Sequence, residues 1–498
     1  MRGRSAIAMG ETTVRYKRIP SREPTDRHDQ EVVTPAYSQM QMEMDQEPTN
    51  SKPSWKFSLP HVCVSIMASF LFGYHLAVVN APLDYIASDL GFSGNPLAEG
   101  LLVSMCLVGA FFGCAISGWI ADGLGRRRAF QVSALPMIVG ALFSAMSSNS
   151  NAMFFGRLIV GVGVGIAGPV TSLYITEVSP AHVRGTYGSL SQIATCLGIL
   201  GALFIGIPAK SIPGWWRVCF WLSAIPAALL ALGMELCAES PQWLVKQSRW
   251  AEAEYEYERL WGEANVKYAM AEVTRLDKGE ETEDVSFIDL LNNRHRKVVS
   301  TGAAIFVFQQ LSGINAVFYF SSTIFKTAGI HPDLANVCVG IANLSASIIA
   351  SFLMDKLGRK ILLLWSFFGM GVAMAVQATA ASLTISPFGK AFLSIGGTLL
   401  FVFMFALGAG PVPALLLPEI FNSRIRAKAL AVCMCVHWVV NCFVGLLFLE
   451  LLKQLGAQVL YSFFAFICML TVVFVNRNVM ETKGKSLEEI EIALLSGH

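Results

Sequence analysis

The sequence predicts an all-α membrane protein with twelve transmembrane helices in two six-helix lobes, joined by a short helical cytosolic linker. Only 14% of the 498 residues are charged and 54% are hydrophobic, whereas about 25% of residues in ordinary soluble domains are charged. The charged residues also avoid runs of about 20 apolar residues, the length that crosses a bilayer as a helix. These runs come as six, then a hydrophilic stretch, then six more, which predicts the two lobes.

The apolar runs also define the predicted domain boundaries. The N-terminal lobe, residues 55–235, contains predicted spans near residues 61–83, 98–121, 129–148, 152–175, 186–207 and 215–235. The C-terminal lobe, residues 298–476, contains predicted spans near residues 298–320, 334–354, 361–383, 390–417, 426–449 and 456–476. Between the lobes, residues 236–297 include WAEAEYEYERLWGEA, which indicates short surface helices in an intracellular linker. A short tail, residues 477–498, ends the chain.

The N-terminal segment, residues 1–54, leaves two interpretations open. It is polar and lacks the apolar core of a secretory signal. Its basic start, MRGRSAIAMGETTVRYKR, is typical of an organelle-targeting segment, but acidic residues accumulate after Glu23, which such segments avoid. The segment is therefore interpreted either as a disordered cytosolic tail or as a targeting segment.

Basic residues between the spans predict the orientation. They follow spans two, four, eight and ten, at Arg126, Arg127, Arg128, Arg184, Arg359, Lys360, Arg424, Arg426 and Lys428. All of these positions share one side with both termini and the linker. By the positive-inside rule this side is cytosolic, or its equivalent in an organelle envelope.

The two lobes repeat a pattern of charges. ADGLGRRR follows span two and MDKLGRK follows span eight, while YITEVSPAHVRG and LLPEIFNSRIRAK follow spans four and ten. Each places an acid before a base, in the pairs Asp122 and Arg126, Asp355 and Arg359, Glu177 and Arg184, and Glu419 and Arg426. The matching signals lie 233 and 242 residues apart, as expected of a two-lobed transporter built by duplication. We interpret these residues as ion pairs that join helix ends and close a cytosolic gate.

Several other signals are given a structural interpretation. Gly163, Gly165 and Gly168 match GxGxxG, but they lie inside a span, which favours close helix packing over dinucleotide binding. The eleven cysteines form no CxxC spacing. The polar segments contain no Ser/His/Asp order, carboxylate pair or metal-ligand spacing. The sequence therefore predicts no enzyme, no metal site, no cofactor and no nucleic-acid partner.

One span, FVFQQLSGINAVFY at residues 306–319, carries several polar side chains. Such groups are costly at membrane depth unless they are paired or face a water-filled cavity. The uncharged amides of Gln309, Gln310 and Asn315 have donors and acceptors that suit a neutral, hydroxyl-rich ligand. They could equally bridge neighbouring helices. The residues of this span alone leave both interpretations open.

Motifs throughout residues 57–495 resemble those of the sugar porters of the major facilitator superfamily, namely GRLIVGVGVG, ESPQWL, QQLSGINAVFYFSSTIF, GPVPALLLPEIF and ETKGKSLEEIE. FGYHLAVVNAPLDYIASDLG and LGAGPVPALLLPEIFNSRIRAKA resemble the plant plastidic glucose transporter group most closely. The resemblance implies the major facilitator fold, a lipid bilayer around a monomeric functional unit, and a monosaccharide substrate held between the lobes. It also implies the plastid inner envelope membrane, with the vacuolar or plasma membrane as alternatives.

The resemblance further implies which residues hold the sugar. They are Gln192, Gln309, Gln310, Asn315, Asn343, Trp438 and Asn441. Amides can bind several hydroxyls at once, and an aromatic face such as that of Trp438 covers the apolar side of a pyranose ring. The family often has Trp in span ten where this chain has Ala414, which predicts weaker cover of the sugar and leaves its selectivity open.

The gate departs from the family pattern at two positions. An acid that many members carry in span ten is Ala406 here, and Gln242 replaces the base of the family's ESPR motif. Arg157 stands in span four, where the family places an arginine. We expect it to pair with a carboxylate such as Glu177 or Glu239 at the inner gate.

His75 bears on the mode of transport. Family proton symporters carry Asp after FGY in span one, and many uniporters carry Asn, whereas this chain carries His75. Because the usual carboxylate is missing, the sequence predicts facilitative uniport. Proton-coupled symport through His75 is the alternative, since histidine can titrate near neutrality. A membrane sugar sensor that binds without transporting is the alternative from another class.

Overall fold

The computed structural model describes residues 53–483 except 211, 281–292, 383–385 and 422–424, and all regular secondary structure in these ranges is helical. Eleven helices in the described ranges are long and apolar enough to cross a membrane. The last, α19 (Arg426–Asn478), has 53 residues, more than twice what one crossing needs, and it breaks at Gly456, where φ is +78°. It therefore provides two crossings, and the predicted all-helical fold with six spans in each lobe is confirmed.

The N-terminal lobe contains the first six spans. Its helices are α2 (Trp55–Ser65), α3 (Met67–Ala77), α4 (Leu83–Asp89), α5 (Pro96–Leu124), α6 (Arg126–Ala145), α7 (Ser150–Val178), α8 (Arg184–Ala209) and α9 (Trp215–Leu236). The first span is made of α2 and α3 together, and α4 is a short helix outside it. Side-chain caps start two of the longer helices: the Oδ1 atoms of Asn95 and Asn149 accept from the N–H groups of Ala98 and Ala152, at 3.3 and 2.8 Å.

The linker and the C-terminal lobe follow. The linker helices are α10 (Pro241–Lys246), α11 (Trp250–Trp261) and α12 (Val266–Glu280). The C-terminal lobe contains α13 (Asn293–Leu311), α14 (Ile314–Thr327), α15 (Pro332–Leu357), α16 (Arg359–Ser382), α17 (Pro387–Met404), the π-helix η4 (Phe405–Ala409), α18 (Pro411–Ile420) and α19. Span seven is α13 followed by α14, and span ten runs through α17, η4 and α18.

Glycines let helices of the N-terminal lobe approach closely. A Cβ on Gly161 or Gly165 of α7 would overlap the backbone of α5, and one on Gly163 would lie 2.5 Å from the Ser133 carbonyl oxygen of α6. Gly168, the last glycine of the GxGxxG match, has open space beside it. Two of the three glycines of that match therefore serve helix packing inside a span.

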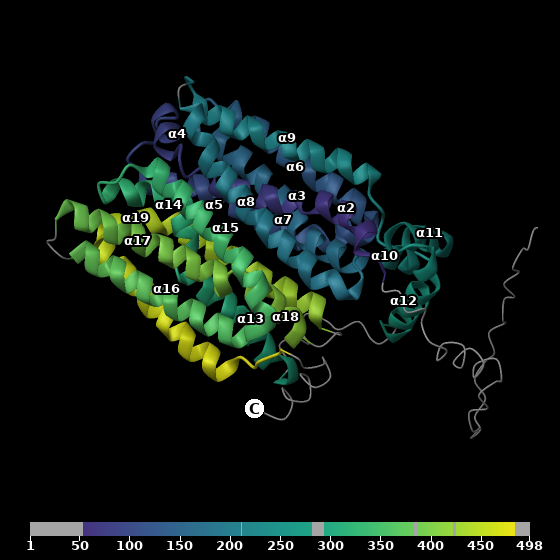
Figure 1. Cartoon of the computed structure of the whole chain (residues 1–498). Coiled ribbons are helices and arrows are strands. Elements are labelled where there is room, and N and C mark those ends of the chain that lie inside the picture. The colour runs from purple at the N-terminus through teal and green to yellow at the C-terminus, as the bar shows by residue number, and fades with distance from the viewer. Residues whose placement is uncertain (1–52, 211, 281–292, 383–385, 422–424, 484–498) are drawn as a thin grey trace, which may run out of the picture. The chain divides into compact units, whose positions relative to one another are not determined.

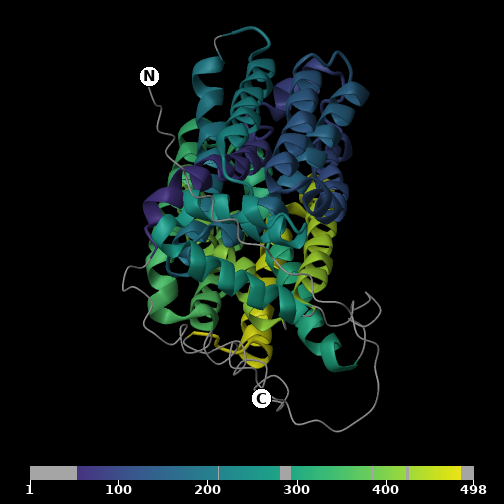
Figure 2. The same ribbon diagram turned by 90° about the vertical axis from the view of Figure 1, so that its right-hand side faces the viewer.

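The two lobes meet along two pairs of helices, α5 with α19 and α8 with α15 (Figures 1 and 2). The linker helices lie at the end where α2 begins, and α4 lies at the opposite end (Figure 1). Trp243 of α10 and Trp261 of α11 attach the linker to the N-terminal lobe, donating to the carbonyls of Asp122 and Val178 at 2.8 and 3.2 Å. We call the linker end the cytosolic end and the α4 end the outer end.

Candidate functional site

Span seven breaks where the predicted sugar-binding amides lie. Gly313 separates α13 from α14 with φ +88°, a conformation that L-residues with a side chain rarely adopt. Gln309 and Gln310 lie on the last turn of α13, and Asn315 lies at the start of α14. The three side chains are buried, with 5%, 2% and 8% of their surfaces exposed. The break therefore brings three amides together in the interior of the C-terminal lobe.

These amides bond to one another and to neighbouring helices. The Asn315 amide donates to Gln310 Oε1, Gln310 Nε2 donates to Gln309 Oε1 at 3.2 Å, and Gln309 Nε2 donates to the Ala409 carbonyl of η4 at 2.6 Å. Gln310 Nε2 also lies 3.1 Å from His437 Nδ1 of α19. In this conformation the amides bridge helices. For a sugar to bind, its hydroxyls would have to replace the present hydrogen-bond partners of the amides.

A side chain from α16 hydrogen-bonds to the backbone of span ten at the π-helix η4. Ser366 Oγ donates to the Met404 carbonyl at 2.6 Å and accepts from the Ala409 N–H at 2.7 Å. One hydroxyl thus satisfies two backbone groups that the irregular helix leaves free. Span ten is thus interrupted at Phe405–Ala409, and this segment carries the carbonyl that Gln309 contacts.

The other predicted sugar ligands lie on three further helices. Asn441 and Trp438 are buried in α19, and Asn441 Oδ1 accepts from the Tyr319 hydroxyl at 3.0 Å. Asn343 of α15 is buried, and its amide has no hydrogen bond with the described residues. Gln192 of α8 is half-buried, with Nε2 3.8 Å from the thiol of Cys196 on its own helix.

Gln192 and Asn343 face the junction between the lobes. Cys196, one turn beyond Gln192, contacts Ser347 Oγ at 3.1 Å, and Ser347 lies one turn beyond Asn343. The predicted ligands therefore come from both lobes, on helices that touch.

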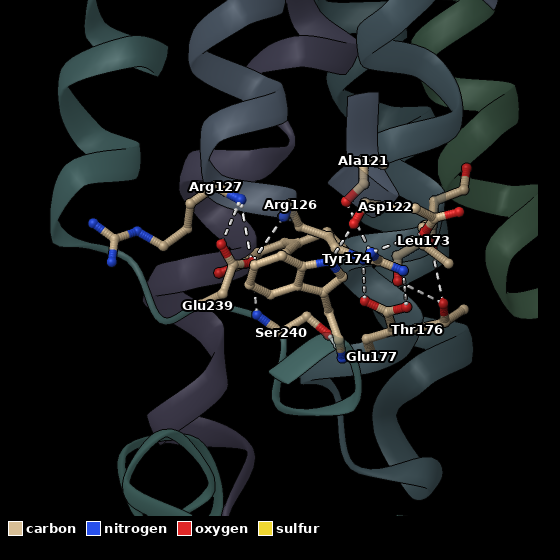
Figure 3. A network of polar contacts seen from close by, with 12 residues as sticks. Ala121, Asp122, Arg126, Arg127, Leu173, Tyr174, Thr176, Glu177, Glu239 and Ser240 are labelled. Carbon is tan, nitrogen blue, oxygen red and sulfur yellow. Dashed lines mark hydrogen bonds and ion pairs between the residues drawn. The ribbon is translucent and has the colours of Figure 1, made fainter. Parts of the chain in front are cut away.

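At the cytosolic end, Arg126 is the centre of a polar network (Figure 3). Its guanidinium donates twice to Glu177, at 2.8 and 2.9 Å, and once to Asp122 at 3.2 Å. Glu239 accepts from the backbone N–H groups of Arg126 and Arg127, at 2.9 and 3.3 Å, and so caps the start of α6. The turn before α6 needs Gly125, because φ is +88° and a Cβ would lie 2.6 Å from Glu239 Oε2.

The C-terminal lobe repeats this network. Arg359 pairs with Glu419 at 3.1 Å, and Glu481 accepts from the backbone N–H groups of Arg359 and Lys360, at 2.9 and 3.0 Å. Gly358 has φ +92° and would carry its Cβ 2.6 Å from Glu481. The sequence reasoning missed Glu481, although it and Glu239 both follow the sixth span of their lobe.

The structure changes several predicted gate pairings. Glu177 takes Arg126 as its partner and Glu419 takes Arg359, so neither uses the base seven residues later. Arg184 forms no ion pair with a described residue, and Arg426 donates to the Phe421 carbonyl at 3.3 Å. The side chain of Asp355 lies outside the described residues.

The expected pairing of Arg157 with Glu177 or Glu239 is wrong. Arg157 and Glu177 are 20 residues apart on the single helix α7, which separates them by about 30 Å. Arg157 instead donates from Nη2 to the backbone carbonyl of His75 at 3.0 Å, in the buried interior of the N-terminal lobe. Glu239 is occupied as the cap of α6.

Glu239 is a half-buried carboxylate of the cytosolic network. Burial raises the pKa of the Glu239 carboxyl above its ordinary value. The backbone N–H donors of Ser240, Arg126 and Arg127 and the charge of Arg126 act in the opposite direction on this pKa.

At the outer end, polar contacts cross between the lobes. The Asn80 amide donates to the Phe318 carbonyl and to Ser321 Oγ, both at 2.7 Å, and Asn80 Oδ1 accepts from the Ser322 N–H at 2.9 Å. Two ion pairs accompany them, Lys326 with Asp84 and Lys210 with Asp333. Among the described residues, the ion pairs at the cytosolic end stay within one lobe. The lobes are therefore tied together at the outer end.

Comparisons with known proteins agree with this architecture. The family described as "Sugar (and other) transporter" matches residues 61–494. The Arabidopsis thaliana protein "Probable plastidic glucose transporter 2" is 61% identical over 98% of this chain and 98% of its own length.

Two solved structures of the xylose transporter XylE are also similar. The proton:xylose symporter bound to 6-bromo-6-deoxy-D-glucose has a TM-score of 0.74 at 27% identity, covering 88% of this chain and 99% of that chain. The partially occluded inward-open conformation of the E. coli protein has a TM-score of 0.76 at 26% identity, covering 86% of this chain and 100% of that chain. This chain therefore belongs to the sugar transporter family of the major facilitator superfamily.

Proposed function

We propose that this chain carries a hexose, glucose first, across the plastid inner envelope membrane by facilitative uniport, with one chain as the functional unit. The name of the Arabidopsis relative supports the sugar and the organelle. The amide cluster of Gln309, Gln310 and Asn315 carries the proposal. Its groups are uncharged, and each bonds to another amide, an imidazole or a backbone carbonyl. Sugar hydroxyls can replace such partners one for one, with no chemical change in the sugar.

The contacts between the lobes support alternating access. The hydrogen bonds of Asn80 and the two outer ion pairs hold the outer end closed. The cytosolic pairs lie within lobes, so the cytosolic end can separate without breaking them. In the proposed cycle this conformation is one that is closed at the outer end. A sugar hydroxyl that accepts a hydrogen bond from Gln309 Nε2 would displace the Ala409 carbonyl from that donor. The π-helix would then be free to bend.

Loss of one amide is expected to weaken sugar binding. Gln309→Ala and Asn315→Ala should each raise the half-saturation concentration for glucose by about 2- to 12-fold, the effect of one neutral hydrogen bond. Uptake into proteoliposomes containing the purified variants measures this. Gln377→Ala is the matched control, because Gln377 is a buried amide that bonds to Ser394 and Thr398 between α16 and α17. Unchanged half-saturation in both site variants would remove the site assignment.

Uniport is supported by the surroundings of His75. No described carboxylate pairs with His75, and the charged Arg157 donates to its backbone carbonyl. A proton on the ring would place a second positive charge beside the first. We therefore expect that an imposed pH gradient will not drive glucose accumulation in proteoliposomes.

Symport through His75 is the competing mode of transport. It is supported by the similarity of this chain to the solved structure of a proton:xylose symporter. Uphill glucose accumulation that is abolished in His75→Asn would establish symport in place of uniport.

A further inference from the structure

A small cavity lies between α3, α5 and α7 of one lobe and α14 and α19 of the other. Its volume is about 10 Å³, close to what one water molecule occupies. Apolar side chains form most of its wall, including Phe72, Leu76, Leu107 and Val164. The polar side chains that line it are His75, Arg157 and Trp438, with the ring of Tyr319. Trp438 is also a predicted sugar ligand, whereas none of the three amides of the proposed sugar site lines this cavity.

The polar side chains that line this cavity have nitrogen atoms without hydrogen-bond partners. Nε and Nη1 of Arg157, both ring nitrogens of His75 and Nε1 of Trp438 are buried and have no hydrogen bond with the described residues. The thiol of Cys114 lies near the Trp438 indole without reaching hydrogen-bond geometry. Arg157 and His75 are each 1% exposed, and Trp438 is 5% exposed. Orphaned buried polar atoms are rare, and the three residues that carry these nitrogens all line one cavity.

Arg157 also lacks a compensating charge. It forms no ion pair with a described carboxylate, and its remaining contacts are the His75 carbonyl at 3.0 Å and the Phe220 ring, 5.9 Å from Cζ. A buried charge without a partner is strongly unfavourable, and a cation–π contact supplies only about 0.5–2 kcal/mol. Arginine stays charged in proteins, so it cannot escape by losing its proton.

We propose that this cavity binds a small monatomic anion, chloride in the first instance, as the counter-ion of Arg157. The guanidinium provides the charge, and the N–H groups of Arg157, Trp438 and His75 provide donors from both lobes. The small volume and apolar wall exclude polyatomic anions such as gluconate. Because Trp438 belongs to α19 and Arg157 to α7, the anion would join the two lobes in the conformation described. This inference does not depend on which sugar is carried.

The experiment measures the Tm of the full-length purified chain in sodium chloride and in sodium gluconate, at equal pH and ionic strength. We expect Tm to rise with chloride concentration, as for a ligand that binds the folded state, and to stay constant in gluconate. Arg157→Gln should lose this rise. Arg128→Gln, which removes an exposed arginine of α6, should keep it.

A second pair of variants keeps the test valid if Arg157→Gln fails to fold. His75→Asp places a fixed carboxylate in the cavity, so chloride dependence should disappear, whereas His75→Asn should retain it. Equal Tm values in chloride and gluconate for the wild-type chain would overturn the proposal and indicate that water alone fills the cavity. A chloride effect that persists in both Arg157→Gln and His75→Asp would also overturn it, by placing the ion elsewhere.

Discussion

Arg126→Ala is expected to lower the free energy of unfolding by about 3–5 kcal/mol, the cost of leaving one member of a buried ion pair without its partner. The side chains of Arg126 and Glu177 are only 4% and 7% exposed, so water cannot replace the two hydrogen bonds between them. The substitution also removes the donors to Asp122 and to the Ala121 carbonyl. Thermal unfolding of the purified protein in detergent measures the loss as a lower Tm.

Two further variants separate the ion pair from general effects of charge. Arg128→Ala removes an exposed arginine two residues away and should leave Tm nearly unchanged. Adding Glu177→Gln to Arg126→Ala should recover part of the lost stability, because the uncompensated carboxylate is then gone. A Tm for Arg126→Ala equal to that of Arg128→Ala would show that the pair does not stabilise the fold.

Asn80→Ala is expected to open the outer end. Asn80 makes three hydrogen bonds across the lobes, each contributing about 0.5–1.5 kcal/mol. Their combined loss should shift the equilibrium toward outer-open molecules by about 10- to 2000-fold. Distances between spin labels on Ser93→Cys and Gln454→Cys, exposed residues of opposite lobes, report the opening. The reactive native cysteines are replaced first.

Asn149→Ala is the matched control for this shift. Its side chain caps α7 through the Ala152 N–H and stays within the N-terminal lobe. It should therefore reduce stability while leaving the label distances unchanged. An Asn80→Ala protein with the wild-type distance distribution would mean that the outer ion pairs alone hold the lobes together.

The fold could be predicted from the sequence because one physical rule dominates it. Each apolar run of about 20 residues must form a helix that satisfies its own backbone groups in lipid. The sequence also separated the last two spans at residues 450–455, and the structure breaks α19 beside them, at Gly456. The π-helix η4 at Phe405–Ala409 could not be predicted from span ten alone, because its geometry depends on Ser366 of another span.

The site was harder to predict because its partners come from distant parts of the chain. The amides of Gln309 and Gln310 were recognisable from composition, but their contacts with Ala409 and His437 depend on how the helices dock. The error on Arg157 had a different cause. The rise of 1.5 Å per residue along a helix places Arg157 about 30 Å from Glu177, in the outer part of α7, so the two charges cannot meet.

The contact between Glu481 and the start of α16 bears on how the chain can be modified at its carboxyl end. Glu481 accepts from two backbone N–H groups, and Thr482 donates to Glu419 at 2.6 Å. Removing Glu481 would leave the backbone N–H groups at the start of α16 without their acceptor. Removing Thr482 would take away the hydroxyl that donates to Glu419, the ion-pair partner of Arg359. Affinity tags and fluorescent fusions should therefore be appended beyond Lys483, so that the contacts of Glu481 and Thr482 are kept.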